Sequence, residues 1–299
     1  MTETTQRSRQ GVLFAIAAYT MWGIAPVYFK ALESVPAIEI VSHRIIWSFV
    51  LVLALILLLR RGGRLKPVLQ NRKHMLRLTV ATFLLGGNWF LFIWAINNDH
   101  ILDASLGYYI NPLLNVAIGM AFFAERMRRL QLVAIGLAFT GVFIQVVSFG
   151  SVPWVALILA SSFAIYGAIR KRLPIDSITG LWLETVILLP IVLVYMLFFA
   201  QSDNVNMLDN SWQINSLLVA AGVVTTAPLL CFTAAAQRIR YSTLGFFQYI
   251  GPSLMFILAV WVYHEPLASD KLVTFGIIWA ALALYSFDSL VHQHRSKRA

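Results

Sequence analysis

Ionisable side chains interrupt two long apolar stretches of this sequence. His43 and Arg44 are neighbours in one stretch, and Glu184 lies in another. A charge in hydrocarbon costs at least about 2.5–3.5 kcal/mol, so in a membrane each would have to face a protein interior or a water-filled cavity. His43 and Glu184 could then bind and release protons, while Arg44 could attract a carboxylate or stabilise an outer gate. The alternative is that Arg44 and Glu184 are structural hydrogen-bonding residues.

Aromatic and amide side chains accompany these charges. Trp47 is placed by helical spacing on the same face as His43 and Arg44. The other apolar stretches place further candidates at a similar depth: Tyr19, Trp22, Asn88 and Trp89. A pocket built from them would hold its ligand by aromatic contact, with the amide groups setting orientation.

Two prolines lie near the middle of apolar stretches. Pro112 shares a helix face with Tyr108, Asn111 and Asn115, and Tyr109 is adjacent. The second face combines Pro252 with Gly245, Gln248 and Tyr249. A proline frees a backbone carbonyl and bends a helix, which can open a cavity between neighbouring helices. These prolines and polar groups are therefore candidates for a binding site, although proline can equally kink a packed helix.

Motifs for covalent, nucleotide or metal chemistry are absent from the sequence. The His-Glu-Pro at His264 is not the HExxH zinc pattern, and there is no Gly-x-Ser-x-Gly or Walker-type loop. The single cysteine, Cys231, lies in an apolar stretch, so no intramolecular disulfide is expected. We expect neither an enzyme nor a cofactor or metal site. Glu125 and Glu265, near stretch ends, are expected to have structural roles in hairpins.

The elements that position these residues are long apolar helices. Of the 299 residues 59% are hydrophobic and only 12% charged, about half the charged fraction of a soluble domain. A bilayer needs about 20 helical residues per crossing. Ten stretches qualify: 11–29, 39–59, 77–97, 103–124, 129–149, 152–169, 177–199, 214–236, 241–263 and 271–291. Their continuous apolar character predicts helices rather than the alternating strands of a barrel.

The net charge of +10 is a signal of orientation. Of the 23 Lys and Arg residues, 20 fall in alternate loops, and the opposite loops hold only Lys30 and Lys271. The positive-inside rule therefore places both termini in the cytoplasm. The basic residues form short clusters between apolar stretches, so no nucleic-acid partner is expected. On this topology Arg44 and Glu184 differ in depth by roughly 12 Å, which predicts separate roles or a water bridge.

The sequence also contains a weak internal repeat. At an offset of 140 residues, Tyr109 matches Tyr249, and Pro112 matches Pro252. Further matches are Ile110 with Ile250, Leu114 with Leu254, Glu125 with Glu265 and Gly136 with Gly276. We predict two repeats, 1–150 and 151–299, each with five spans and therefore inverted relative to each other. Inverted repeats recur in secondary transporters, with the site near the bilayer midplane.

Several motifs together resemble one known family. They are His43-Arg44-Ile45-Ile46-Trp47-Ser48, Asn88-Trp89, Ser105 to Pro112, Tyr166-Gly167-Ala168-Ile169-Arg170-Lys171, Leu183-Glu184-Thr185 and Gln248 to Pro252. In this order they are similar to the RarD proteins, a branch of the EamA group in the drug/metabolite transporter superfamily. The resemblance implies a ten-helix basket of two repeats with cytoplasmic termini, and a secondary exporter of small metabolites or drugs. It also implies an association with chloramphenicol sensitivity, which fixes no physiological substrate.

We therefore expect a multi-pass protein of the bacterial cytoplasmic (inner) membrane that exports an amphipathic solute by alternating access. Its partners would be a small-molecule solute and the lipid bilayer. The protein itself would be a monomer or a weak dimer. A non-transporting receptor or scaffold is the alternative, but it leaves the polar residues at depth unexplained. A channel is disfavoured because the sequence shows no ring of repeated charges and no carbonyl-rich filter.

Overall fold

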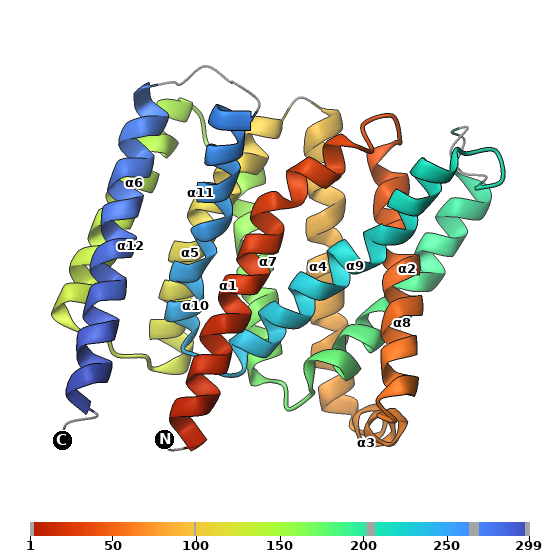
Figure 1. The fold of residues 1–299 in the computed structure, drawn as a ribbon, viewed down its shortest axis with the longest axis horizontal. Coiled ribbons are helices and arrows are strands. Elements are labelled where there is room, and N and C mark those ends of the chain that lie inside the picture. The colour runs from red at the N-terminus through yellow and green to blue at the C-terminus, as the bar shows by residue number, and fades with distance from the viewer. Residues whose placement is uncertain (1–2, 99, 201, 203–206, 263–268, 297–299) are drawn as a thin grey trace. The chain divides into compact units, whose positions relative to one another are not determined.

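The structure, a computed structural model, describes residues 3–98, 100–200, 202, 207–262 and 269–296. All regular elements in these residues are helical (Figure 1). Nine helical segments in this part of the chain are long and apolar enough to cross a membrane, and each coincides with a predicted span; the ninth, Tyr241–Val262, contains a break. The tenth predicted span, 271–291, falls in a helix whose apolar part is the shorter Leu272–Asp288.

The helices have the following bounds: α1 Glu3–Lys30, α2 Ala37–Leu58, η1 Gly62–Arg64, α3 Leu65–Gln70, α4 Arg72–Asn97, α5 Ile101–Phe123, α6 Arg129–Phe149, α7 Trp154–Arg172, α8 Ser177–Phe198, α9 Trp212–Ala236, α10 Tyr241–Gln248, α11 Ile250–Ile257, η2 Leu258–Val262 and α12 Ser269–Ser296. Polar side chains set two of the starts. Asp176 accepts a hydrogen bond from the Thr179 amide before α8, and Ser211 accepts one from the Ile214 amide before α9.

Four helix starts recur after the repeat offset of 140 residues. The helices α2, α4, α5 and α6 are followed at that offset by the starts of α8, α9, α10 and α12. The predicted span 241–263 is not one continuous helix, however. It divides at Tyr249 into α10 and α11 and ends in the π-helical turn η2. Pro252 has no amide hydrogen and would clash with the carbonyl of Gln248, so the break falls one turn before the proline.

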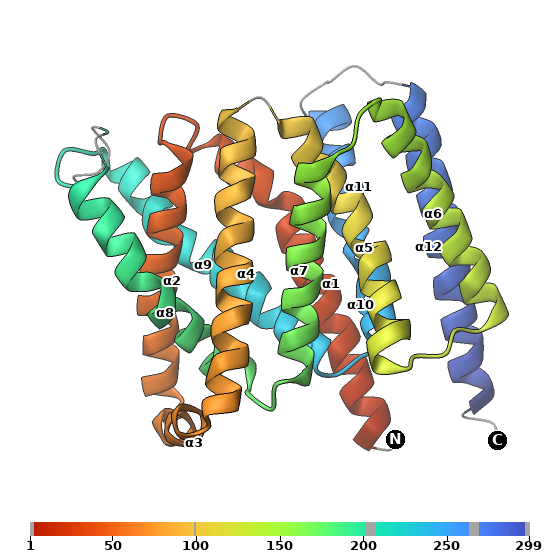
Figure 2. The same cartoon turned by 180° about the vertical axis from the view of Figure 1, so that it is seen from behind.

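The chain forms two compact units, and each unit contains segments from both halves of the sequence. Unit 1 is Met1–Trp94 with Ile165–Ile239, and unit 2 is Ala95–Ala164 with Arg240–Ala299. Within unit 1, α9 packs against α1 and α2, and α2 packs against α8 (Figure 1). Within unit 2, α5 packs against α10, and α6 runs beside α12 (Figure 2). Three of these contacts, α2 with α8, α5 with α10 and α6 with α12, join elements related by the repeat offset.

Candidate functional site

Arg44 in unit 1 contacts a threonine hydroxyl and aromatic faces. Its Nε donates to Thr225 Oγ1 of α9 at 2.8 Å. The guanidinium carbon lies 5.0 Å from the ring centroid of Trp89 and 5.5 Å from that of Phe29. Aromatic faces attract a cation and cover it without adding a counter-charge. This half-buried cation is therefore oriented by side chains of α1, α4 and α9.

Glu184 is buried beside a second arginine that the sequence analysis did not select. Arg170 Nε lies 3.3 Å from Glu184 Oε1, and the two side chains are 0% and 1% exposed. The hydroxyl of Tyr166, one turn before Arg170 on α7, donates to Glu184 Oε2 at 3.4 Å. The carboxylate is thus compensated by a guanidinium and a phenol from one neighbouring helix.

The 20 basic residues assigned above to alternate loops include Arg170, but this residue lies inside α7 and is fully buried. Its spacing of four residues from Tyr166 places both on one helix face, and this was the signal available in the sequence. The guanidinium packs on the backbone of α8 at Gly180. A Cβ at that position would lie 2.1 Å from Arg170 Nη1, so only glycine leaves room for the group as it stands.

An aromatic cluster adjoins this buried ion pair through Tyr166. Tyr166 stacks on Phe232 at a centroid distance of 6.2 Å. Phe232 also contacts two of the predicted site residues, Tyr19 at 6.3 Å and Trp22 at 5.8 Å. The rings of Tyr19 and Trp22 lie 5.7 Å apart. Tyr19 and Trp22 are thereby linked through Phe232 and Tyr166 to Glu184.

A small cavity of unit 1 lies between the Arg44 and Glu184 sites. Its volume is about 10 Å³, room for about one water molecule. Thr225, which holds Arg44, lines it on α9, and Glu184 lines it on α8. The other lining residues are Ile45, Ser48, Leu85, Trp89, Leu181, Thr185, Leu188 and Leu229. Helices α2 and α4 of the first half and α8 and α9 of the second therefore meet around it.

His43 and Trp47 lie on α2 near the cavity-lining residues of that helix. The side chain of His43 is buried, and its Nδ1 has no hydrogen-bond partner among the described residues. Trp47 packs at the crossing of α2 and α9. A Cβ added to Gly222 of α9 would lie only 2.7 Å from the Cβ of Trp47, so the two helices are close here. Ser48 Oγ donates to the Gly222 carbonyl at the same crossing. Asn88 is half-buried in α4, directly before Trp89.

The predicted amide residues of unit 2 hydrogen-bond to one another and to the backbone. Asn111 Nδ2 donates to the Ala160 carbonyl at 2.5 Å. Asn115 Nδ2 donates to Gln248 Oε1 at 2.8 Å and to Asn111 Oδ1 at 3.2 Å. All three amide side chains are buried. This network joins α5 to α7 and α10, so it has a packing role whatever else it does.

The tyrosines and prolines of unit 2 are arranged around the same helices. The hydroxyl of Tyr249 donates to the carbonyl of its repeat counterpart Tyr109 at 3.3 Å. The ring of Tyr109 contacts Phe275 at 5.6 Å, whereas Tyr108 is 38% exposed. Pro112 lies within a continuous α5.

Glu125 stabilises the start of α10. Its carboxylate accepts hydrogen bonds from the amides of Tyr241 and Ser242 at 2.6 and 2.9 Å, and from Ser242 Oγ at 2.6 Å. An acidic group at a helix N-terminus satisfies free amides and favours the helix dipole. Glu125 therefore has a structural role, although its partner is the start of α10 and not its own α5–α6 hairpin. Glu265 and His264 lie outside the described residues.

Comparison with known proteins identifies the family. The EamA-like transporter family matches residues 9–147 and again residues 151–287. An uncharacterized transporter of Vibrio cholerae is 56% identical over 299 residues, covering 100% of this chain and 99% of the relative. Protein RarD of Escherichia coli is 52% identical over 293 residues, covering 98% and 99%. A solved crystal structure has the same fold, with a TM-score of 0.72 at 18% identity over 93% of this chain and 96% of that one.

These matches extend over both halves of the chain and agree with the apolar helices described above. The chain is a multi-pass membrane protein that belongs to the EamA-like transporter family and has RarD proteins among its relatives.

Proposed function

We propose that this protein is a secondary transporter that exports small amphipathic metabolites or drugs across the bacterial cytoplasmic membrane by alternating access. The observation that carries the proposal is the buried charge in unit 1. Arg170 and Glu184 form a buried ion pair between apolar helices, and Glu184 lines a small cavity. Arg44 is half-buried and bonded to Thr225, which lines the same cavity, in a chain whose family is one of transporters. Buried ions are costly in a membrane and typically mark a substrate or ion pathway. A receptor or scaffold role leaves these charges unexplained.

The proposed substrate site is centred on Arg44. Its guanidinium has donors suited to a carboxylate, and the faces of Trp89 and Phe29 supply apolar contact. This composition favours an amphipathic solute with a carboxylate group, such as an amino acid or a related metabolite. Chloramphenicol is a further compound to test, from the family resemblance alone.

The size of the cavity supports a mechanism with moving helices. A space for about one water molecule cannot hold such a solute. The helices that line it, from both sequence halves, would have to separate to admit a ligand. In alternating access they separate on one side of the membrane at a time.

Proton coupling is proposed at Glu184, with His43 as the second candidate. Glu184 contacts the cavity on one side and Arg170 and Tyr166 on the other. A proton that enters the cavity would neutralise the carboxylate and weaken its attraction to Arg170. Protonation would thus change the forces between α7 and α8, which is what a coupling site requires.

The finer topology is also proposed: ten spans in two inverted five-helix repeats, 1–150 and 151–299, with both termini cytoplasmic. The recurrence of four helix starts after 140 residues supports it, as does the loop charge. Single-cysteine variants in a Cys231→Ser background test the orientation. Positions in 207–212 should react with an impermeant thiol reagent from the periplasm, and positions in 62–73 only after permeabilisation. Periplasmic reaction at 62–73 would reverse the assignment.

The experiment that tests the transport function is solute flux in liposomes that contain the purified protein. These proteoliposomes, with an imposed pH gradient, are screened against a pool of metabolites that includes chloramphenicol. We expect protein-dependent accumulation of at least one amphipathic carboxylate, with a weaker apparent affinity for it in Arg44→Gln. If no solute of the pool moves faster than through protein-free liposomes, the proposal fails for that class of compound.

A further inference from the structure

The segment between α2 and α4 carries a dense positive charge. Seven basic residues occupy 60–77: Arg60, Arg61, Arg64, Lys66, Arg72, Lys73 and Arg77. The sequence contains no Asp or Glu between Glu39 and Asp99. Such a cluster directly beside a membrane span has the composition of a site for anionic lipid headgroups.

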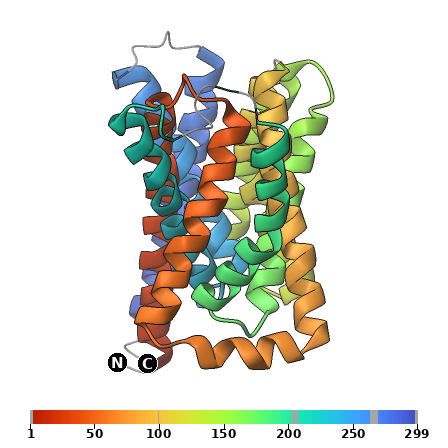
Figure 3. The same ribbon diagram turned by 90° about the vertical axis from the view of Figure 1, so that its right-hand side faces the viewer.

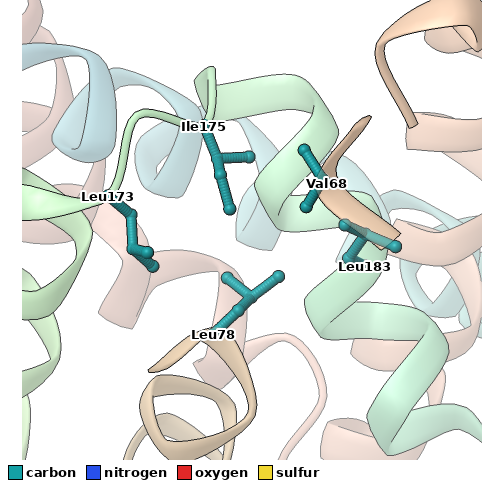
Figure 4. Close-up of a cluster of buried hydrophobic side chains, with 5 residues drawn as sticks. All are labelled: Val68, Leu78, Leu173, Ile175 and Leu183. Atoms are coloured by element: carbon teal, nitrogen blue, oxygen red, sulfur yellow. The ribbon is translucent and has the colours of Figure 1, made fainter. Parts of the chain in front are cut away.

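The same segment lies across the ends of its neighbouring helices. Helix α3 runs roughly perpendicular to α2 and α4, along the end of unit 1 (Figure 3). Val68 anchors it, because this side chain is buried against Leu78, Leu173, Ile175 and Leu183 (Figure 4). The loop is also fixed by Asp176, which pairs with Arg61 at 3.1 Å and with Arg64 at 3.7 Å. The segment is therefore held in place at the level where the spans end.

The outer face of this segment combines exposed cations with exposed leucines. The basic residues other than Arg61 are exposed. Beside them, Leu58, Leu69 and Leu76 are 79%, 52% and 66% exposed. Asp176, half-buried, already contacts two of the arginines, so most of the positive charge lacks an acidic counterpart in this segment. Exposed leucines are costly in water and favourable at the boundary between headgroups and acyl chains.

We propose that residues 57–77, here called the α3 surface, bind the headgroups of anionic phospholipids such as phosphatidylglycerol. Arg60, Lys66, Arg72 and Lys73 would contact the phosphates, and the leucines would enter the acyl boundary. A soluble phosphate compound would satisfy the cations but not the leucines. The proposal is independent of what the protein transports, because it depends only on this segment.

Native mass spectrometry of the full-length protein tests the α3 surface. The protein in neutral detergent is titrated with phosphatidylglycerol and, separately, with phosphatidylcholine. Lys66→Gln/Arg72→Gln should weaken phosphatidylglycerol binding about tenfold or more at low salt, with a smaller salt dependence than wild type. Arg126→Gln/Arg129→Gln is the matched control, since it removes two exposed basic residues elsewhere. Phosphatidylcholine binding should be the same in all three proteins.

A third variant separates a lipid site from a site for soluble anions. Leu69→Ser should weaken phosphatidylglycerol binding while all charges remain, and inorganic phosphate should not displace the lipid. The proposal is overturned if Lys66→Gln/Arg72→Gln and Arg126→Gln/Arg129→Gln weaken phosphatidylglycerol binding equally, or if neither weakens it. It is also overturned if inorganic phosphate displaces the lipid when both are at the same concentration. Thermal unfolding of each variant confirms that the comparison concerns folded protein.

Discussion

Arg170 and Glu184 form an ion pair, 3.3 Å from Nε to Oε1, that is sealed from the surface of the protein. The pair joins α7 to α8, and none of the three guanidinium nitrogens has a hydrogen-bond partner in the part of the chain that the structure describes. A buried pair of this kind adds little stability overall, but losing one partner is strongly destabilising.

Gly180→Ala should disturb this pair without deleting either charge. The new Cβ would occupy the position of the guanidinium, which is the flexible end of its side chain and has to move. We expect a folded protein with a lower Tm and a shifted pH profile of transport. Gly136→Ala is the control, because a Cβ there meets no atom within 4 Å. A Gly180→Ala protein that matches the control in both measurements would contradict the described packing.

Arg44→Gln should reduce the affinity for a carboxylate solute. Removing a charged hydrogen-bond donor costs about 1.5–3 kcal/mol, which is roughly a tenfold to hundredfold weaker apparent affinity. Arg44→Lys should be intermediate, since it keeps the charge but loses the planar donor geometry. Leu193→Ala, at an exposed position of α8, serves as control. The apparent affinity is measured from the transport rate at increasing solute concentration. Equal affinities in Arg44→Gln and the control would show that Arg44 does not bind the solute.

Asn111→Ala distinguishes packing from binding in unit 2. The Asn111 amide donates to the Ala160 carbonyl, so its removal leaves a buried acceptor without its partner. We expect a loss of about 1–3 kcal/mol of stability, seen as a lower Tm, with solute affinity unchanged. If the Tm is that of wild type and the affinity falls instead, Asn111 belongs to the binding site, as the sequence analysis predicted.

Asp176→Asn should destabilise the protein in a pH-dependent way. Burial would raise the pKa of Asp176, but hydrogen bonds from Thr179 and the charges of Arg61 and Arg64 outweigh it and lower the pKa. A carboxyl group with a lowered folded pKa stabilises above its ordinary pKa, and the contribution is lost as pH falls through the folded value. The Tm difference between wild type and variant should therefore shrink in acid and in high salt, because the carboxylate is partly exposed. A difference that is constant from neutral pH to pH 3 would contradict this.

Much of the architecture could be predicted from hydropathy, because each predicted span needs only a continuous apolar stretch. The break at Tyr249 was missed because proline position alone does not say whether a helix bends or restarts. Candidate residues such as Arg44 and Trp89 were identifiable as polar or aromatic groups in apolar stretches, and the structure brings them into contact. Their partner Thr225 and the pairing of Glu184 with Arg170 depend on helix packing, which local sequence patterns do not encode.

Glu184 is the residue proposed to couple solute movement to protons. The measurement is transport in liposomes by wild type and by Glu184→Gln. One assay imposes a pH gradient. The other has no pH gradient and measures the exchange of solute inside the liposomes for solute outside. Glutamine keeps the size of the side chain but cannot gain or lose a proton. We predict that gradient-driven transport is lost in Glu184→Gln while exchange continues. Gradient-driven transport at the wild-type rate, in a variant shown to be folded and inserted, would contradict the claim and leave Glu184 a structural role.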